Sequence, residues 1–407
     1  MRSVLLLVLV ASAVVLLGDH DSAKGTDNTT CAAAPTVPSL ELIYRLEAGK
    51  RKVTPSTRRA AMAIVCERLQ AILKTDGQVQ ALTGSRIRVI FPQVGGVRQT
   101  QRAAEQLGEP GRLYFYDWEP NLIGPEQKVG GHPGKSPPAI ALRRANREWH
   151  AAGRDVSRPE NARLIYAGAF PSAFGAVRLA SEQKPREHCA GCSASTPRFY
   201  AFDRSAAHKL VAGPFSDRAE LHGTLRQGQR DKDIVLKIPV GTTIASEPPT
   251  SRSGEVIASA EPGWFALKDR PALNDLDIVS PNQGIDEFGG PTVAFGFTDK
   301  GQTAFERLTR KIARRGRAAA IGPVDGYGAE ALSGHLATIF DGEVKTRPII
   351  NFADFPNGID GRTGAQISGG FPNVRAAQDF ATTLKIGALP INMVLTRKQV
   401  LGRVVGS

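Results

Sequence analysis

Two cysteines separated by two residues are the feature of this sequence most able to do chemistry. The segment reads His188-Cys189-Ala190-Gly191-Cys192. Such a pair can close a local disulfide, exchange disulfides with another thiol, or supply half of a zinc site, here with His188 and His208. No thioredoxin-like strand and helix precede the motif, and the histidine stands on the wrong side of it for haem attachment. We therefore favour a local disulfide between Cys189 and Cys192.

The other two cysteines are Cys31 and Cys66. Cys66 falls on the apolar face of a predicted helix, together with Val65 and Leu69. We therefore favour a buried thiol at Cys66, with a bridge to Cys31 as the alternative.

Motifs that bind nucleotides or support hydrolysis are absent from the sequence. GxGxxG, GxxxxGK[ST], HExxH and GxSxG do not occur. Asp341 and Asp354 are carboxylates that scattered hydrolase chemistry could use, but Asp341-Gly342 is better explained as a hairpin turn. We therefore predict no catalytic residue, no cofactor, no metal ligand and no enzymatic activity.

Basic residues outnumber acidic ones, with 52 Lys and Arg against 39 Asp and Glu and a formal net charge of +13. The densest basic patch lies on a helix predicted from Lys300 to Arg315, opposite an apolar face formed by Phe305, Leu308 and Ile312. The candidate contacts with an anionic membrane surface or phosphates are Arg307, Arg310, Lys311, Arg314 and Arg315. The alternative is a solvated helix face that binds nothing.

An apolar run from Val4 to Leu17 predicts an export signal within residues 1–18. As a helix it would rise about 21 Å, short of the roughly 30 Å hydrocarbon core, so a cleaved signal and a short membrane anchor both remain open. Residues 19–39 are polar and rich in Ala and Pro, as is typical of a flexible tether. We expect a protein that is secreted or anchored to the plasma membrane and faces outward, which argues against nucleic acid as a partner.

Residues 40–118 predict a first domain whose elements follow the order strand, helix, strand, strand, helix, strand. This order is the ferredoxin-like pattern. The predicted elements are a strand at Leu42–Tyr44, a helix beginning at Thr54-Pro55, strands near Val79–Leu82 and at Arg86–Phe91, a helix over Arg98–Leu107 and a strand at Leu113–Tyr116.

The middle of the chain, residues 119–262, is rich in Gly and Pro and predicts an irregular insertion of unassigned topology. It includes a helix over Ala139–Ala152 and short apolar segments at Leu164–Tyr166, Phe199–Phe202 and Ile234–Ile238. The last third predicts clearer elements. These are strands at Trp264–Leu267, Thr292–Phe297 and Ala337–Phe340, the basic helix over Lys300–Arg315, and a helix over Val374–Ile386 that stops at Gly387.

Four blocks of the last third, in the same order along the chain, resemble the SecD/SecDF protein-export family. They are Thr292–Thr309, Leu336–Pro348, Gly364–Phe371 and Leu384–Pro390. The first domain adds weaker similarity at Arg68, Arg86–Pro92 and Leu113–Phe115. The motif positions that carry the resemblance are Asp341, Gly342, Pro348, Gly364, Gln366, Ile367, Ser368, Gly369, Phe371, Gly387, Ala388, Leu389 and Pro390.

The resemblance implies the first extracytoplasmic domain of such a protein. It would comprise a ferredoxin-like base over 40–118, a head-like α+β subdomain over 263–350 and a returning base segment over 351–407. In the family this domain is thought to hold emerging preprotein and to move relative to the membrane. The proton-conducting helices that would follow Pro390 are missing here, so we expect an accessory of Sec-dependent export that contacts unfolded preprotein or Sec membrane subunits. The alternative is an exported binding module that recognises an unrelated envelope ligand through its insertion.

Overall fold

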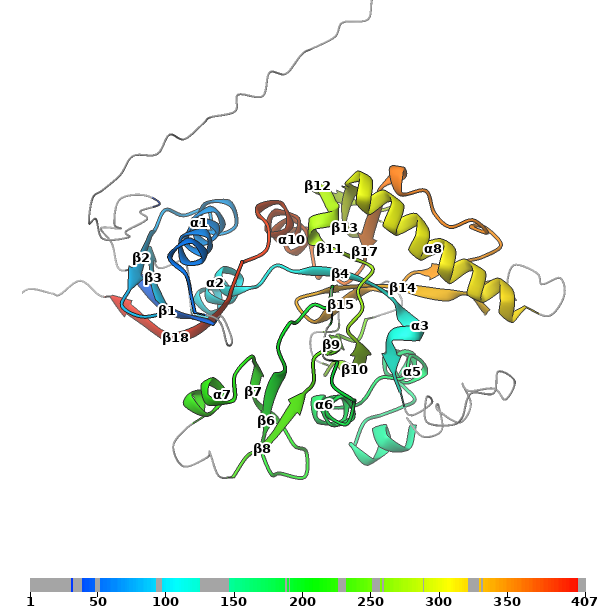
Figure 1. Ribbon diagram of the computed structural model, residues 1–407, viewed down its shortest axis with the longest axis horizontal. Helices are drawn as coiled ribbons and strands as arrows, with labels where there is room; N and C mark the ends of the chain where they lie inside the picture. The colour runs from blue at the N-terminus through cyan, green and yellow to red at the C-terminus, as the bar shows by residue number, and fades with distance from the viewer. Residues whose placement is uncertain are drawn as a thin grey trace, which may run out of the picture.

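A computed structural model describes most of the chain. The described residues are 31, 39–47, 52–92, 97–124, 146–186, 189, 191–225, 232–250, 257, 260–287, 289–320, 329–330 and 332–401. The expected export signal, most of the expected tether and His188 lie outside them. Within the described part, the fold is mixed α+β, with helices packed on several separate sheets (Figure 1).

A four-stranded antiparallel sheet combines the two ends of the described chain. Its strand order is β18-β1-β3-β2, and the red strand β18 lies beside the blue strand β1 in Figure 1. The apolar positions of β3 alternate as predicted, with Ile87, Val89 and Phe91 buried against the two helices. The elements are β1 (Ser39–Glu47), α1 (Pro55–Ala71), β2 (Gln78–Leu82), β3 (Arg86–Pro92), α2 (Val97–Gly108) and β18 (Asn392–Leu401).

The strand predicted at Leu113–Tyr116 forms, but it does not join the four-stranded sheet. It is β4 (Leu113–Asp117), which pairs with β11 and β14 in another sheet. Strand β18 occupies the position beside β1 instead. The alternation of a strand defines which side chains share a face, whereas its pairing partner depends on where the intervening chain leads.

The largest sheet has eight strands and contains β4. Its main path is β11-β4-β14-β15-β9-β10-β5, and β16 pairs with β14. The bounds are β5 (Leu122–Ile123), β9 (Thr242–Glu247), β10 (Gly263–Lys268), β11 (Leu273–Asn274), β14 (Gly334–Phe340), β15 (Glu343–Thr346) and β16 (Ile349–Ile350). The short helix α3 (Trp118–Asn121) links β4 to β5.

A three-stranded sheet with two long helices builds the largest described core. Its strands are β12 (Ile278–Ile285), β13 (Pro291–Phe297) and β17 (Ala365–Ser368), and its helices are α8 (Asp299–Ala319) and α10 (Val374–Ile386). Phe305, Leu308 and Ile312 of α8 are buried in this core, as their spacing predicts. Because β17 and α10 share this core, residues 365–386 belong with the preceding segment, and only the chain after Gly387 returns to the four-stranded sheet.

The predicted insertion also contains a sheet, of order β7-β6-β8. Its strands are β6 (Arg198–Phe202), β7 (Leu210–Phe215) and β8 (Ile234–Ile238), accompanied by α5 (Pro159–Tyr166), α6 (Ala173–Ser181) and α7 (Arg218–Thr224). The apolar segment Leu164–Tyr166 is therefore the end of a helix. Of the helix predicted over 139–152, residues 146–151 are helical and residues 139–145 lie outside the described residues.

All four cysteines are paired in the structure. Cys31 is bonded to Cys66, with Cα atoms 5.5 Å apart, and Cys189 is bonded to Cys192. The buried thiol favoured for Cys66 is therefore wrong, because Cys31 packs against the core that contains α1, a contact that helix periodicity alone does not reveal. Within the described residues, no helix is both long enough and apolar enough to cross a membrane.

Candidate functional site

The chain crosses twice between the four-stranded unit and the rest of the molecule. Residues 109–112 leave it after α2, and residues 387–391 return to it after α10. The two crossings are hydrogen-bonded to each other, since the Leu389 amide donates to the Pro110 carbonyl at 2.8 Å. Any change in the orientation of the two parts relative to each other would therefore move the residues of this junction.

Arg68 fastens the junction from the side of the four-stranded unit. Its side chain is fully buried on α1, and its guanidinium donates to the carbonyl oxygens of Gln106, Leu107 and Glu109 at the end of α2. It also donates to the Gly387 carbonyl at 3.4 Å. Burial lowers the pKa of Arg68, and the nearby carboxylates of Glu109 and Asp341 oppose that effect.

Asp341 holds the same junction from the opposite side. It begins the β14–β15 hairpin turn in a left-handed conformation, with φ 47°. Its carboxylate accepts the amide hydrogens of Gly111 at 2.8 Å and Arg112 at 2.9 Å. The structure thus brings the motif positions Asp341, Gly342, Gly387, Ala388, Leu389 and Pro390 to one place, although the sequence separates them into two blocks.

The remaining motif positions lie in the body of the fold. Ile367 and Phe371 are buried in the core of α8 and α10, and the Pro348 carbonyl accepts the Leu336 amide at 3.0 Å. Gly364 has φ 73°, and a Cβ there would lie 2.6 Å from the Phe295 carbonyl oxygen. The rest are Gln366, Ser368 and Gly369, in or just after β17. These positions build the fold and do not converge on a site.

A cleft of about 930 Å³ opens beside the junction. Four parts of the molecule contribute to its lining: the four-stranded unit, the crossing segment, the β6–β7 hairpin and the large sheet. Residues that line it include Thr57, Arg112, Tyr114, Ser193, Thr196, Arg198, Tyr200, Leu210, Phe215, Ile244, Trp264, Asp341, Asn392 and Met393. Its lining combines aromatic rings, aliphatic groups and hydroxyls, and this mixture suits a ligand with both apolar and polar groups.

The segment that follows the CxxC motif, from Ser193 to Thr196, forms part of the cleft lining. Asp269 is fully buried, and its carboxylate accepts hydrogen bonds from the Tyr116 hydroxyl, the Ser193 amide and hydroxyl, and the Ala194 amide. The loop that follows Cys192 is thereby held against the large sheet. His208 lies elsewhere, with its ring tilted against that of Phe174 and the ring centroids 4.1 Å apart. The described residues contain no cluster of His, Cys, Asp or Glu side chains able to hold a metal ion.

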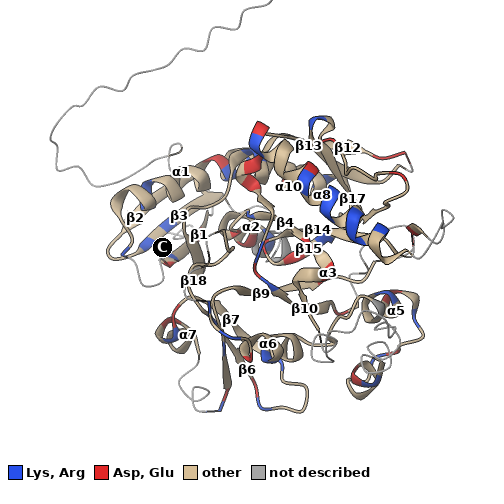
Figure 2. Ribbon diagram, turned by 45° about the vertical axis from the view of Figure 1, so that its right-hand side comes forward, with Lys and Arg blue, Asp and Glu red and all other residues tan. Residues whose placement is uncertain are grey.

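The basic face of α8 is partly neutralised, although blue residues dominate it in Figure 2. Arg315 forms ion pairs with Asp117 at 2.8 Å and Glu119 at 2.7 Å, and Lys311 pairs with Asp117 at 3.3 Å. Arg310 pairs with Glu306. Arg307 and Arg314 are exposed and have no ion-pair partner among the described residues. The structure therefore leaves a smaller free cationic surface than the sequence predicts.

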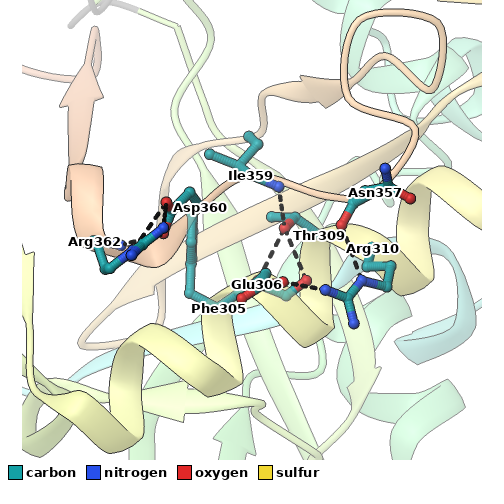
Figure 3. A network of polar contacts seen from close by, with 8 residues as sticks. All are labelled: Phe305, Glu306, Thr309, Arg310, Asn357, Ile359, Asp360 and Arg362. Carbon is teal, nitrogen blue, oxygen red and sulfur yellow. Dashed lines mark hydrogen bonds and ion pairs between the residues drawn. The ribbon is translucent and has the colours of Figure 1, made fainter.

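The loop before β17 lies along the other side of α8 (Figure 3). The Thr309 hydroxyl accepts the Ile359 amide at 2.8 Å, and Arg310 donates to the Asn357 carbonyl at 2.9 Å. Arg362 pairs with Asp360 within the loop. These contacts indicate that Arg310 has a structural role, because it joins α8 to this loop.

The sequence did not reveal the cleft or the role of Arg68. The lining comes from segments spread from Glu47 to Val394, and no local pattern connects them. The sequence does contain one indication that Arg68 has a structural role. It occupies a position on α1 among apolar residues, where a charged side chain needs buried partners.

Part of the chain is similar to known proteins. Residues 253–391 match the family model described as SecDF, P1 head subdomain. The protein translocase subunit SecD of Rhodobacter capsulatus is 26% identical over 170 residues, which cover 41% of this chain. The chain thus spans about a quarter of the length of that curated relative, 26%.

Two solved structures were also found to be similar. A crystal structure of SecDF in the super-membrane-facing form is 17% identical and covers 89% of this chain and 31% of the other, with a TM-score of 0.42. A structure of a membrane component SecDF that enhances protein export is 16% identical and covers 88% and 98%, with a TM-score of 0.38. Residues 253–391 of this chain are thus similar to the P1 head subdomain of SecDF, and part of the chain is similar to a SecD subunit of the protein-export machinery.

Proposed function

We propose that this protein is a non-enzymatic accessory of Sec-dependent protein export that holds segments of unfolded polypeptide outside the membrane. The observation that carries the proposal is the cleft beside the junction. Its walls offer aromatic rings such as Tyr114 and Trp264 next to hydroxyl groups such as Thr57 and Thr196. Apolar surface with scattered hydrogen-bonding groups can hold many different extended sequences, and this is what a carrier of emerging chains requires.

The four-stranded unit serves, in this proposal, as the ferredoxin-like base of the domain. Its strand order and its two helices fit that role, with β18 as the fourth strand. The junction of Arg68, Asp341 and the two crossing segments then acts as the hinge on which base and head turn. Such a turn would change the width of the cleft, because the cleft is lined from both sides of the hinge.

Attachment to the membrane completes the proposal. Residues 1–18 serve as export signal or membrane anchor. Arg307 and Arg314, two exposed basic residues of α8 that form no ion pair with the described residues, contact the anionic lipid surface. Cys189 and Cys192 keep the wall of the cleft in place as a local disulfide.

Site-specific photocrosslinking in intact cells tests the proposal. A photoreactive residue at Leu210, which is 39% exposed and lines the cleft, is expected to capture nascent secretory chains or Sec subunits. The matched control is Phe355, which is 41% exposed and lies outside the cleft. Capture of a single unrelated envelope protein or polymer from Leu210 would instead establish the alternative, a binding module that recognises a different ligand.

A further inference from the structure

The disulfide between Cys189 and Cys192 is partly exposed and borders the cleft. Both cysteines are partly exposed, and Gly191 between them is exposed, with φ 82°. Ser193, the next residue after Cys192, lines the cleft. A chain bound in the cleft would therefore pass within one residue of this bond.

The fold has little hold on this disulfide. Its cysteines have a sequence separation of 3, whereas Cys31 and Cys66 have a separation of 35 and pack against the apolar core of the four-stranded unit. In the chain-entropy model a disulfide stabilises a fold by restricting the unfolded chain, and this effect grows with loop length. By linkage, the fold protects the long-range bond from reduction more than the local one. We therefore expect thiols to open the Cys189–Cys192 bond more readily.

Asp269 anchors the segment after Cys192 through hydrogen bonds that do not involve the disulfide. Its buried carboxylate accepts the Ser193 amide at 2.9 Å, the Ser193 hydroxyl at 2.8 Å and the Ala194 amide at 3.2 Å. Opening the sulfur–sulfur bond would therefore leave this part of the cleft lining anchored.

The backbone carbonyl of Asp269 is placed to bind a thiol at Cys192. Its oxygen lies 2.9 Å from Cys192 Sγ and 3.7 Å from Cys189 Sγ. A disulfide sulfur has no hydrogen to donate, whereas a thiol donates a weak hydrogen bond to a carbonyl oxygen. Opening the bond would thus give this oxygen a donor at Cys192. Cys189, the sulfur farther from the carbonyl, is the one left for an incoming thiolate.

Basic residues flank the contact between Asp269 and the two sulfurs. Lys268 and Arg270 are the neighbours of Asp269 in the chain. The Arg186 side chain lies against Gly241, whose carbonyl accepts the Asp269 amide at 2.9 Å. Positive charge favours thiolate over thiol, and reactive cysteines are typical of partly exposed, electropositive surroundings. The Asp269 carboxylate opposes this effect, but four hydrogen-bond donors share its charge.

We propose that the Cys189–Cys192 disulfide exchanges reversibly with cysteine thiols of polypeptides held in the cleft. This inference rests on the proposed function and adds a covalent contact to it. The thiolate of the bound chain attacks Cys189 Sγ and forms a mixed disulfide, while the Cys189–Cys192 bond breaks and Cys192 leaves with its electron pair and takes a proton from solvent. Attack by the Cys192 thiolate on the mixed disulfide restores the first bond. The exchange is therefore stoichiometric and needs no further oxidant or reductant.

Graded reduction of the full chain in mild detergent tests whether the bond opens. The protein is equilibrated with mixtures of reduced and oxidised glutathione, free thiols are alkylated, and mass spectrometry of proteolytic fragments locates them. The Cys31–Cys66 bond of the same molecule is the internal control. We expect the Cys189–Cys192 bond to open in mixtures about tenfold less reducing than those that open the control. Opening of both bonds together, or of Cys31–Cys66 first, would overturn the inference.

Capture of a peptide tests whether the exchange serves chains in the cleft. In Cys192→Ser the mixed disulfide on Cys189 cannot be resolved and accumulates. The probe is an unstructured fluorescent peptide whose single cysteine is bonded to glutathione, which leaves when Cys189 attacks. We expect capture about tenfold faster than reaction with oxidised glutathione alone, because binding in the cleft raises the effective concentration of the peptide. The matched variant Cys189→Ser, which retains Cys192, is expected to capture the peptide more slowly.

Fluorescence anisotropy of the same peptide with Ser in place of Cys measures binding without exchange. Binding of this peptide together with capture no faster than that of glutathione would overturn the inference and leave the proposed function standing. Absence of both binding and capture would remove both.

Discussion

Arg68 shows how a single residue can define the geometry of a whole domain. Its guanidinium replaces water as the donor for carbonyl oxygens at the ends of two helices that are far apart in the sequence. A hydrogen bond from a charged donor stabilises the native state more than one between neutral groups. A buried carbonyl that loses its donor has no hydrogen bond, and the native state is destabilised by the full desolvation cost of that group. The residue therefore joins α1, α2 and the segment after α10 more effectively than an apolar side chain of the same volume.

Replacing Arg68 with Met is expected to lower the free energy of unfolding by about 2 to 4 kcal/mol, because the carbonyls of Leu107, Glu109 and Gly387 would lose a donor. Urea unfolding followed by circular dichroism measures the change. Arg59→Met provides the matched control, since Arg59 is exposed on the same helix. A loss no larger than that of the control would show that Arg68 does not hold the junction.

At the scale of elements, α8 is fixed to the start of the large sheet by charge as well as by packing. Glu119 of α3 accepts the His335 amide at 3.0 Å and lies 2.6 Å from His335 Nδ1, while Arg315 of α8 binds its other oxygen. Burial by itself raises the pKa of Glu119. The hydrogen bond from His335 and the charges of His335 and Arg315 outweigh burial, so the pKa of Glu119 is lower than usual.

This lowered pKa predicts a pH-dependent stability. A carboxyl whose pKa is depressed by folding stabilises the native state above its unfolded pKa of about 4.3, and that contribution is lost as the pH falls through the lower native value. Glu119→Gln is expected to be less stable than the wild type at pH 7, and the difference is expected to shrink below about pH 4. Urea unfolding at both pH values measures it, with the exposed Glu261→Gln as a control of small effect. An equal difference in the free energy of unfolding between variant and wild type at both pH values would contradict the prediction.

At the scale of the whole molecule, two crossings connect the four-stranded unit to the remainder. Besides the junction, α2 and α10 meet through the Gln106 amide, which donates to Asp379 at 3.0 Å. Arg375 of α10 donates to the Ile72 carbonyl after α1. The proposed hinge motion must break or slide these contacts, whereas the covalent chain and the Arg68 contacts remain.

A covalent cross-link between α2 and α10 at the Gln106–Asp379 contact is expected to abolish support of protein export without lowering the stability of the protein. Gln106→Cys and Asp379→Cys introduced together provide the only free thiols, because all four native cysteines are in disulfides. A short bis-maleimide then joins α2 to α10. Export of a secretory reporter in cells or membrane vesicles is the measurement, and the single Gln106→Cys variant treated with the same reagent is the control. Unaltered export by the locked protein would rule out hinge motion.

The sequence by itself determined the local elements and the resemblance to the SecD/SecDF family. Helix periodicity and caps placed α1, α8 and α10 within a few residues, because these signals depend only on neighbours along the chain. The four ordered blocks identified the SecD/SecDF relationship for the same reason. Contacts between distant segments were decided only by the tertiary structure. They include the pairing of β1 with β18, the Cys31–Cys66 bond, the burial of Arg68 and the cleft that contains Arg112 and Arg198. Strand alternation specifies a face but not a partner, and the partner of a buried charge can lie anywhere in the chain.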